Sequence, residues 1–246
     1  MPVQPVNARI NQLLDGLPVA EEALILSHSK EVELRFGDVL GLAGKAHTYA
    51  YFPLTGMISL LATVDEAAAL EMGMIGNEGV LGATLLLGVE ESPLRAVVQG
   101  KGTALRLTAA ALQDALLDCP VLSARMNRYL YVLMAQLNTT AGCTHFHQVS
   151  ERLVRWLLMM DDRTAASSMH LTQQYLADML GVQRSAVSIA AGALQASNLI
   201  SYSRGEIKVL DRKGLENAAC SCYPALVKIQ KEHHLEQTTA PKQIRR

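Results

Sequence analysis

The spacing of apolar residues along the chain changes near Thr108, and this change separates two kinds of structure. Between residues 32 and 107, apolar residues form short or alternating runs that glycine and proline interrupt. Such runs predict β-strands, and those expected here cover residues 32–36, 48–52, 57–63, 70–75 and 104–107. Several strands without a long helical pattern between them favour an antiparallel barrel or sandwich over a parallel α/β sheet.

Helical spacing precedes and follows the predicted strands. Residues 7–29 predict two short helices with Pro18 between them. After Thr108, which is suited to cap a helix through residue 117, the helical period continues for about 50 residues. Pro120 suits the first turn of a helix that extends to about residue 144 and spans about 35 Å.

An apolar stripe follows this long central helix at spacings of three and four residues, and it contains Met126, Leu130, Leu133 and Leu137. The helix is longer than one small barrel needs, so we expect the stripe to pair with a second copy, as in a two-stranded coiled coil. The alternative is that the stripe packs on its own domain. One more amphipathic helix, over residues 149–160, and a polar loop over residues 161–169 are expected next.

Residues 171–190 carry the most specific local pattern in the chain. Thr172 can cap a first helix, Ala177 is small enough for a close helix contact, and Gly181 permits a left-handed turn four residues later. A second helix is expected to begin near Arg184. Two short strands around Arg204-Gly205 would then form a wing. This pattern predicts a winged helix-turn-helix, whose second helix enters the major groove of DNA.

The order of barrel, long helix, helix-turn-helix and wing resembles the Crp/Fnr family of bacterial transcription regulators. Leu171-Thr-Gln-Gln-Tyr-Leu-Ala-Asp-Met-Leu-Gly-Val and Asn198-Leu-Ile-Ser-Tyr carry the resemblance at the C-terminal end. Tyr51-Phe-Pro and Ile75-Gly-Asn-Glu-Gly-Val-Leu-Gly carry it in the barrel. The ending Leu215-Glu-x-x-Ala-Cys-Ser-Cys-Tyr resembles one branch of the family, whose effectors the resemblance does not name.

The resemblance implies an α+β chain with a cyclic-nucleotide-binding-like jelly roll, a long dimerisation helix and a winged helix-turn-helix. The expected boundaries are 1–118 for the sensing barrel with its N-terminal helices, 119–147 for the central helix, 148–233 for the DNA-binding domain and 234–246 for a disordered tail. The implied partners are a palindromic double-stranded operator, a second copy of the chain, RNA polymerase and an unidentified small-molecule effector. The activity implied is regulatory and not enzymatic, so no catalytic residue is expected.

The predicted DNA contacts combine the motif and the resemblance; they are Thr172, Gln173, Gln183, Arg184, Ser185, Ser188 and Arg204. Family members often have a Glu where this chain has Ser185 and an Arg where it has Ile189. Arg paired with guanine and Glu paired with cytosine are base-specific contacts. The two departures therefore imply an operator half-site that differs from those of better-known relatives.

The resemblance places the tentative effector site at Glu78, Gly79 and Arg95. Members that bind cyclic nucleotides hold the phosphate with an Arg, but Leu94 stands at that position and Arg95 follows one residue later. On a strand, a shift of one residue turns the side chain to the opposite face. Cyclic AMP is therefore not the expected effector, and the cofactor remains open.

Composition and charge agree with this interpretation. The 246 residues include 22 Lys and Arg against 23 Asp and Glu, and half of all residues are hydrophobic, which excludes a mainly disordered chain. Residues 1–147 hold 9 basic and 14 acidic side chains, whereas residues 148–246 hold 13 and 9, so the basic excess lies in the predicted DNA-binding part. Neither a signal peptide nor a membrane span is readable, and we expect a cytoplasmic protein.

The cysteines leave an alternative open. No cysteine precedes Cys119, so the N-terminal cysteine group of the family's iron–sulfur members is absent, and buried thiols with no metal ligand are the default expectation. One alternative is a redox or metal sensor with the same DNA-binding output, using Cys143, Cys220 and Cys222. A second, from another class, is a metal-dependent enzyme using Cys143, His145 and His147.

Overall fold

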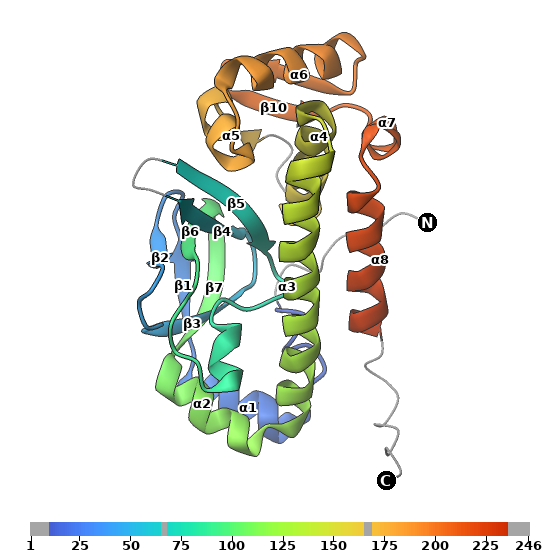
Figure 1. Cartoon of the computed structure of the whole chain (residues 1–246). Coiled ribbons are helices and arrows are strands. Elements are labelled where there is room, and N and C mark those ends of the chain that lie inside the picture. The colour runs from blue at the N-terminus through green and yellow to red at the C-terminus, as the bar shows by residue number, and fades with distance from the viewer. Residues whose placement is uncertain (1–9, 65–67, 165–168, 236–246) are drawn as a thin grey trace.

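The computed structural model describes residues 10–64, 68–164 and 169–235 (Figure 1). Its N-terminal part contains two antiparallel sheets, one of three strands in the order β1-β7-β3 and one of four in the order β2-β6-β4-β5. The strands are β1 Lys30–Leu34, β2 Val39–Gly41, β3 Tyr49–Pro53, β4 Met57–Val64, β5 Ala68–Ile75, β6 Arg95–Gly100 and β7 Gly102–Thr108. The predicted antiparallel barrel or sandwich is confirmed, whereas β2, β6 and the 3₁₀ turn η1, Ala83–Leu87, are additions to the expected strands.

Only the second of the two expected N-terminal helices forms within the described residues. Helix α1, Val19–His28, begins directly after Pro18, but residues 12–16 are turns. Asn11 explains the difference, because its side-chain amide donates to the backbone carbonyls of Pro53 and Gly79, each at 2.9 Å. Tertiary hydrogen bonds therefore override the helical pattern at this point.

The long central helix is present and slightly longer than expected. Helix α2, Ala109–Asp118, is capped by the Thr108 hydroxyl, which accepts from the Ala111 amide at 3.2 Å, and α3 then spans Pro120–Phe146. Buried Glu21 of α1 accepts from the Val121 amide at 3.1 Å and from the Leu122 amide at 2.9 Å. A carboxylate at a helix N-terminus is favourable because it meets unpaired N–H groups and the positive end of the helix dipole.

The apolar stripe of α3 does not form the predicted dimer seam. Met126 is fully buried in the chain's own N-terminal core, and Leu130 and Leu133 pack against that core. Gln136, on the same side, donates to the Met74 carbonyl at 3.0 Å and accepts from the Met74 amide at 3.1 Å. The barrel covers this face, so the seam predicted there is wrong and the alternative, packing on its own domain, is correct for these residues.

The C-terminal part contains the expected helix-turn-helix and wing. Its elements are α4 Val149–Asp161, β8 Met169–His170, α5 Gln173–Leu180, α6 Arg184–Ala196, β9 Ile200–Ser203, β10 Glu206–Val209, α7 Arg212–Ala218 and α8 Cys222–Leu235. The strands β8, β10 and β9 form one antiparallel sheet in that order. The expected tail began at residue 234, but α8 continues to Leu235, and residues 236–246 lie outside the described part of the chain.

The two parts share a continuous apolar core. Barrel residues such as Met57 and Met74 are in the same buried cluster as Trp156 of α4 and Leu176 of α5. Helix α3 runs between the barrel and α8, which packs along it (Figure 1). Both ends of the DNA-binding part are thereby attached to the rest of the molecule, at α4 and at α8.

None of the described helices is both long enough and apolar enough to cross a membrane.

Candidate nucleic-acid interface and a cysteine–histidine cluster

The turn between α5 and α6 has the geometry that the sequence predicts. The Thr172 hydroxyl accepts from the Tyr175 amide at 3.1 Å and caps α5. Ala177 is buried between the helices, and Gly181 ends α5 with a φ of 61°, a conformation that favours glycine. The short helix α5 is thus fixed at both ends before α6 begins.

The two sides of α6 differ sharply in exposure. Val187, Ala190 and Leu194 are buried in the domain core. The predicted DNA contacts at the start of α6 are exposed; they are Gln183, Arg184 and Ser185. Ile189 is 75% exposed on the same helix. An apolar side chain at such a position can contact the methyl group of thymine.

Ser188 and Gln173, both predicted DNA contacts, lie together. The Ser188 hydroxyl donates to the Gln173 side-chain oxygen at 2.6 Å, linking the start of α5 to the second turn of α6. Ser188 is half-buried. The Ser188–Gln173 hydrogen bond therefore orients α6 against α5. Arg184 is more exposed than Ser188 and is better placed to contact a base.

The wing presents Arg204 at its tip. Arg204 and Gly205 have φ values of 51° and 81°, which form the tight turn between β9 and β10. The Tyr202 hydroxyl donates to the Leu171 carbonyl at 2.8 Å and attaches the wing to the start of the helix-turn-helix. Arg204 is exposed, as a residue that contacts a DNA phosphate has to be.

The tentative effector residues have structural partners. Glu78 forms a nearly buried ion pair with Arg163 at 2.8 Å, which links a barrel loop to the residues after α4. Gly79 lies against Tyr129, whose ring would be 2.3 Å from any added Cβ. Arg95 is half-buried on β6, opposite Leu61 of β4. An effector role for these three residues stays a prediction.

A cleft of about 650 Å³ lies between the barrel and the DNA-binding part. Residues of both parts line it, including Gly56 and Lys101 from the barrel and His170 and Glu206 from the winged domain. Its volume is in the range of small-molecule sites. This cleft could not be predicted from local sequence patterns, because it depends on how the two parts pack.

Glu71 is a buried carboxyl group that the sequence analysis missed. It lies on β5 within the shared core, where the Ser59 hydroxyl donates to it. Burial raises its pKa to about 7, although the Ser59 hydrogen bond and the charge of Arg155 act in the opposite direction. This carboxyl group is therefore partly protonated near neutral pH.

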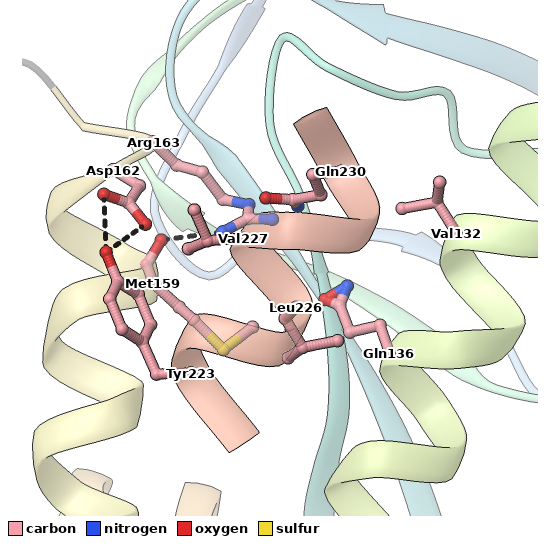
Figure 2. Close-up of a pocket in the computed structure, with 9 residues that line it drawn as sticks. All are labelled: Val132, Gln136, Met159, Asp162, Arg163, Tyr223, Leu226, Val227 and Gln230. Carbon is pink, nitrogen blue, oxygen red and sulfur yellow. Dashed lines mark hydrogen bonds between the residues drawn. The ribbon is translucent and has the colours of Figure 1, made fainter. Parts of the chain in front are cut away.

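Helix α8 is attached to the end of α4 by polar contacts around Tyr223. The Tyr223 hydroxyl hydrogen-bonds to the Asp162 carboxylate at 3.1 Å, and Arg212 donates to the Tyr223 oxygen at 2.9 Å and pairs with Asp161 and Asp162. Figure 2 shows Tyr223 and Leu226 of α8 facing Met159 of α4 and Gln136 of α3. These contacts hold α8 in the groove between α3 and α4.

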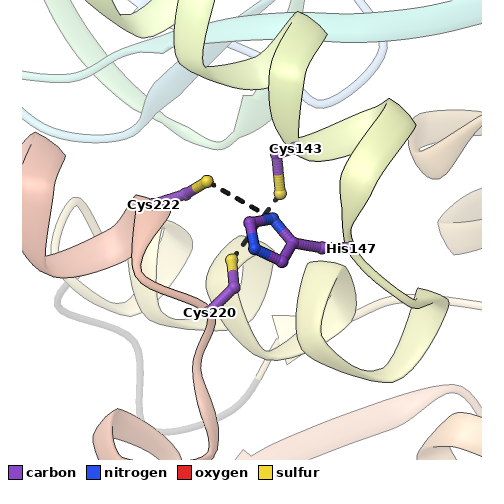
Figure 3. A group of neighbouring side chains, drawn as sticks. All are labelled: Cys143, His147, Cys220 and Cys222. Atoms are coloured by element: carbon purple, nitrogen blue, oxygen red, sulfur yellow. Dashed lines mark hydrogen bonds between the residues drawn. The ribbon is translucent and has the colours of Figure 1, made fainter.

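Beside these contacts, three cysteines and one histidine converge at the end of α3 (Figure 3). Cys143 and His147 lie one helical turn apart, and Cys220 and Cys222 come from the segment that begins α8. The sulfur and nitrogen atoms lie within 4.8 Å of one another. The Cys143–Cys220 hydrogen bond lowers the pKa of the Cys220 thiol and raises that of Cys143.

The structure separates the two cysteine alternatives. The three cysteines of the sensor alternative lie together, and His147 joins them. His145, which the enzyme alternative requires, is exposed, and its ring lies edge-on to that of Phe146 with ring centroids 4.6 Å apart. Of the three residues proposed for an enzyme, Cys143 and His147 therefore lie in the cluster and His145 does not.

Comparisons with known proteins agree with this geometry. Residues 151–218 match the family described as the Crp-like helix-turn-helix domain. None of the curated proteins matches the chain.

Three solved structures are similar over most of this chain. FixK2 from Bradyrhizobium japonicum is 17% identical, covers 78% of this chain and 98% of its own, and has a TM-score of 0.66. The c-di-GMP responsive global regulator CLP of Xanthomonas campestris is 17% identical, with coverage of 79% and 100% and a TM-score of 0.65. TTHA1359, a transcriptional regulator from Thermus thermophilus, is 23% identical, with coverage of 77% and 98% and a TM-score of 0.60.

The exposed start of α6, the wing and the family match define the C-terminal part as a DNA-binding helix-turn-helix domain. The barrel, the long helix α3 and this domain, in this order, make up the fold of the similar structures. Residues 151–218 are thus a Crp-like helix-turn-helix domain, and the chain as a whole shares the fold of the similar structures.

Proposed function

We propose that this chain is a transcription regulator of the Crp/Fnr type that binds a palindromic operator as a homodimer, with one α6 helix in the major groove of each half-site. The observation that carries the proposal is the exposed start of α6, where Gln183, Arg184 and Ser185 make no part of the domain core. Arg204 at the wing tip contacts the phosphate backbone beside each half-site. Thr172 and Gln173, at the N-terminus of α5, lie beside the same strand of DNA.

A stripe on α3 away from the barrel supports a second copy as the partner. Its members recur at spacings of three and four residues, and all are exposed; they are Asn127, Tyr131, Met134, Asn138, Ala141 and His145. Met134 is 67% exposed and Tyr131 is 52% exposed, which is unusual for large apolar side chains in a helix centre. Because this spacing has the 3.5-residue period of a coiled coil, we assign the dimer seam to this exposed stripe.

Signal reception belongs to the barrel side of the molecule. The cleft beside Gly56 and Lys101 is bounded by both parts, so a small molecule bound there would change their relative positions. The Glu78–Arg163 ion pair connects the barrel to the end of α4 and provides a further route. We place the regulator in the cytoplasm, where it binds the operator and contacts RNA polymerase.

Selection of bound DNA from a pool of random duplexes tests the function. The expected result is an enriched palindrome whose half-site centres lie one helical turn, about 34 Å, apart. The selection is repeated after small molecules that co-purify have been removed, and a change in enrichment then reports an effector. A pool without any enriched sequence would contradict sequence-specific binding.

A further inference from the structure

The cysteine–histidine cluster has distances that suit one metal ion. The Cys143 and Cys220 sulfur atoms are 3.6 Å apart, and the Cys222 sulfur lies 3.5 Å from Nδ1 of His147. Zinc bonds of about 2.3 Å to sulfur and about 2.0 Å to nitrogen give tetrahedral edges of about 3.8 Å between two sulfurs and about 3.5 Å between sulfur and nitrogen. Two of the six edges of the cluster thus already have nearly the lengths of a tetrahedral site.

The three thiols and one imidazole of the cluster limit which metal ions it can bind. Thiolates and imidazole select zinc or a similar soft divalent ion, and they exclude magnesium and calcium, which take oxygen ligands. An iron–sulfur cluster has to fit several iron and sulfide ions between its thiolates, so it holds them farther apart than a single ion does. A group confined within 4.8 Å therefore favours a mononuclear centre.

We propose that Cys143, His147, Cys220 and Cys222 bind one zinc ion in a closed tetrahedral site. Three cysteines and one histidine form a common ligand set of structural zinc. The ligands come in two pairs, one in the last turn of α3 and the other where α8 begins, and 77 residues separate Cys143 from Cys220. The ion would join the central helix to the C-terminal helix.

The surroundings of the cluster balance its charge. Three thiolates and one Zn²⁺ carry a net charge of −1, and the thiol protons leave to solvent as the ion binds. The positive charge of Arg155 favours the thiolate forms of Cys143 and Cys222, and Arg152 also interacts electrostatically with Cys143. Both arginines are buried, and Nε of Arg155 has no hydrogen-bond partner among the described residues. Buried cations beside a buried anionic centre compensate each other.

The burial of the cluster and its position in the fold are those expected of a site that binds a metal ion permanently. Cys143 and Cys220 are buried, whereas Cys222 and His147 are half-buried, so the ion enters from one side and is then enclosed. His147 is the C-cap residue directly after α3, two residues before α4 begins the DNA-binding part. Zinc would therefore fix α8 against the junction between the dimerisation helix and the DNA-binding domain.

Metal analysis of the full-length protein tests the proposal independently of DNA binding. Protein produced with added zinc and purified under reducing conditions is expected to contain about one zinc ion per chain. Co²⁺ added to metal-free protein should give the visible absorption of a tetrahedral cobalt–thiolate centre. Zinc should also protect three thiols of the unmodified chain from alkylation, a measurement that requires no variant, and should raise the melting temperature by about 5 to 10 °C.

Matched variants locate the site. His147→Ala and Cys222→Ser should lower the zinc content at least fivefold, whereas His145→Ala and Cys119→Ser should keep it, because His145 and Cys119 lie outside the cluster. Circular dichroism confirms that each variant is folded. Folded protein that binds neither zinc nor cobalt would overturn the proposal, as would iron with inorganic sulfide, or a Cys143–Cys220 disulfide in the reduced preparation.

Discussion

The C-terminal part has two surfaces that differ in how they are built. The DNA-facing surface, the start of α6 with the wing tip, exposes Arg184 and Arg204 and contributes little to the core. The anchoring surface, formed by α4, α5 and α8, is buried against the barrel and α3. Recognition and attachment are therefore separable, so substitutions on one surface should change DNA binding and those on the other should change stability or assembly.

The largest expected effect comes from the exposed stripe of α3. Met134→Glu with Ala141→Glu places like charges beside their symmetry mates in the proposed seam, so the protein should sediment as a monomer. Loss of the second recognition helix should weaken binding to a palindrome by about 10²-fold or more.

Leu117→Glu is the matched control, because Leu117 is 84% exposed on α2, away from the stripe. The control should remain a dimer. If the double variant also remains a dimer, the seam lies elsewhere and α3 does not pair through this face.

On β5, against which the anchoring surface packs, the pKa of Glu71, raised by burial to about 7, predicts a pH-dependent stability. The folded state keeps the proton between about pH 4.5 and pH 7 while the unfolded chain has lost it, so the free energy of unfolding falls as pH rises through this range. The full decrease is about 3 kcal/mol. Glu71→Gln should remove it and stabilise the protein above pH 7, measured by denaturant unfolding at several pH values.

Glu90→Gln, a change at an exposed carboxylate, serves as the control for this series and should keep the pH dependence of the unmodified protein. A Glu71→Gln variant with an unchanged pH dependence would place the titrating group elsewhere.

On the DNA-facing surface, Arg184→Ala should weaken binding to the selected operator by about 1 to 3 kcal/mol, because a bidentate Arg contact to a base has this value. Its thermal unfolding should stay unchanged, since the side chain is exposed. Lys213→Ala, at an exposed position of α7, is the matched control and should retain operator affinity. A large loss of stability in Arg184→Ala would contradict the idea that DNA recognition and attachment depend on different residues.

The smallest effect is expected at the wing. Arg204→Ala should weaken binding to all sequences alike and lower the salt dependence of binding by about one unit per phosphate contact. Titrations at several salt concentrations measure both quantities. An unchanged affinity and an unchanged salt dependence would show that the wing tip does not contact the backbone.

The sequence predicted the helix-turn-helix and its wing better than the packing of distant segments, and the reason is physical. Local rules sufficed for the helix-turn-helix, because the Thr172 cap, the turn at Gly181 and the Arg204-Gly205 wing tip depend on neighbouring residues. They failed where distant segments decide the structure. Residues 10–17 have a helical pattern but do not form a helix, because the Asn11 side chain hydrogen-bonds to distant backbone carbonyls. The stripe that contains Met126 packs on the barrel instead of on a second copy of the chain.

For the same reason, the sequence predicted only one of the two pairs of residues in the cysteine–histidine cluster. The four-residue spacing of Cys143 and His147 predicts a shared helix face, but the contribution of Cys220 and Cys222 depends on where α8 packs. Leu226 and His233 recur at helical spacing and were the available signal for α8. That signal predicts a helix and does not predict that it lies along α3.

Base-resolved selection shows whether α6 reads the operator. Random duplexes are selected in parallel with the unmodified protein, Arg184→Ala and the Lys213→Ala control. If α6 reads the operator, all three proteins should select the same palindrome, with preference relaxed at one base pair in each half-site for Arg184→Ala alone. Identical preferences at every position for Arg184→Ala and the unmodified protein would contradict it, because Arg184 would then contact no base.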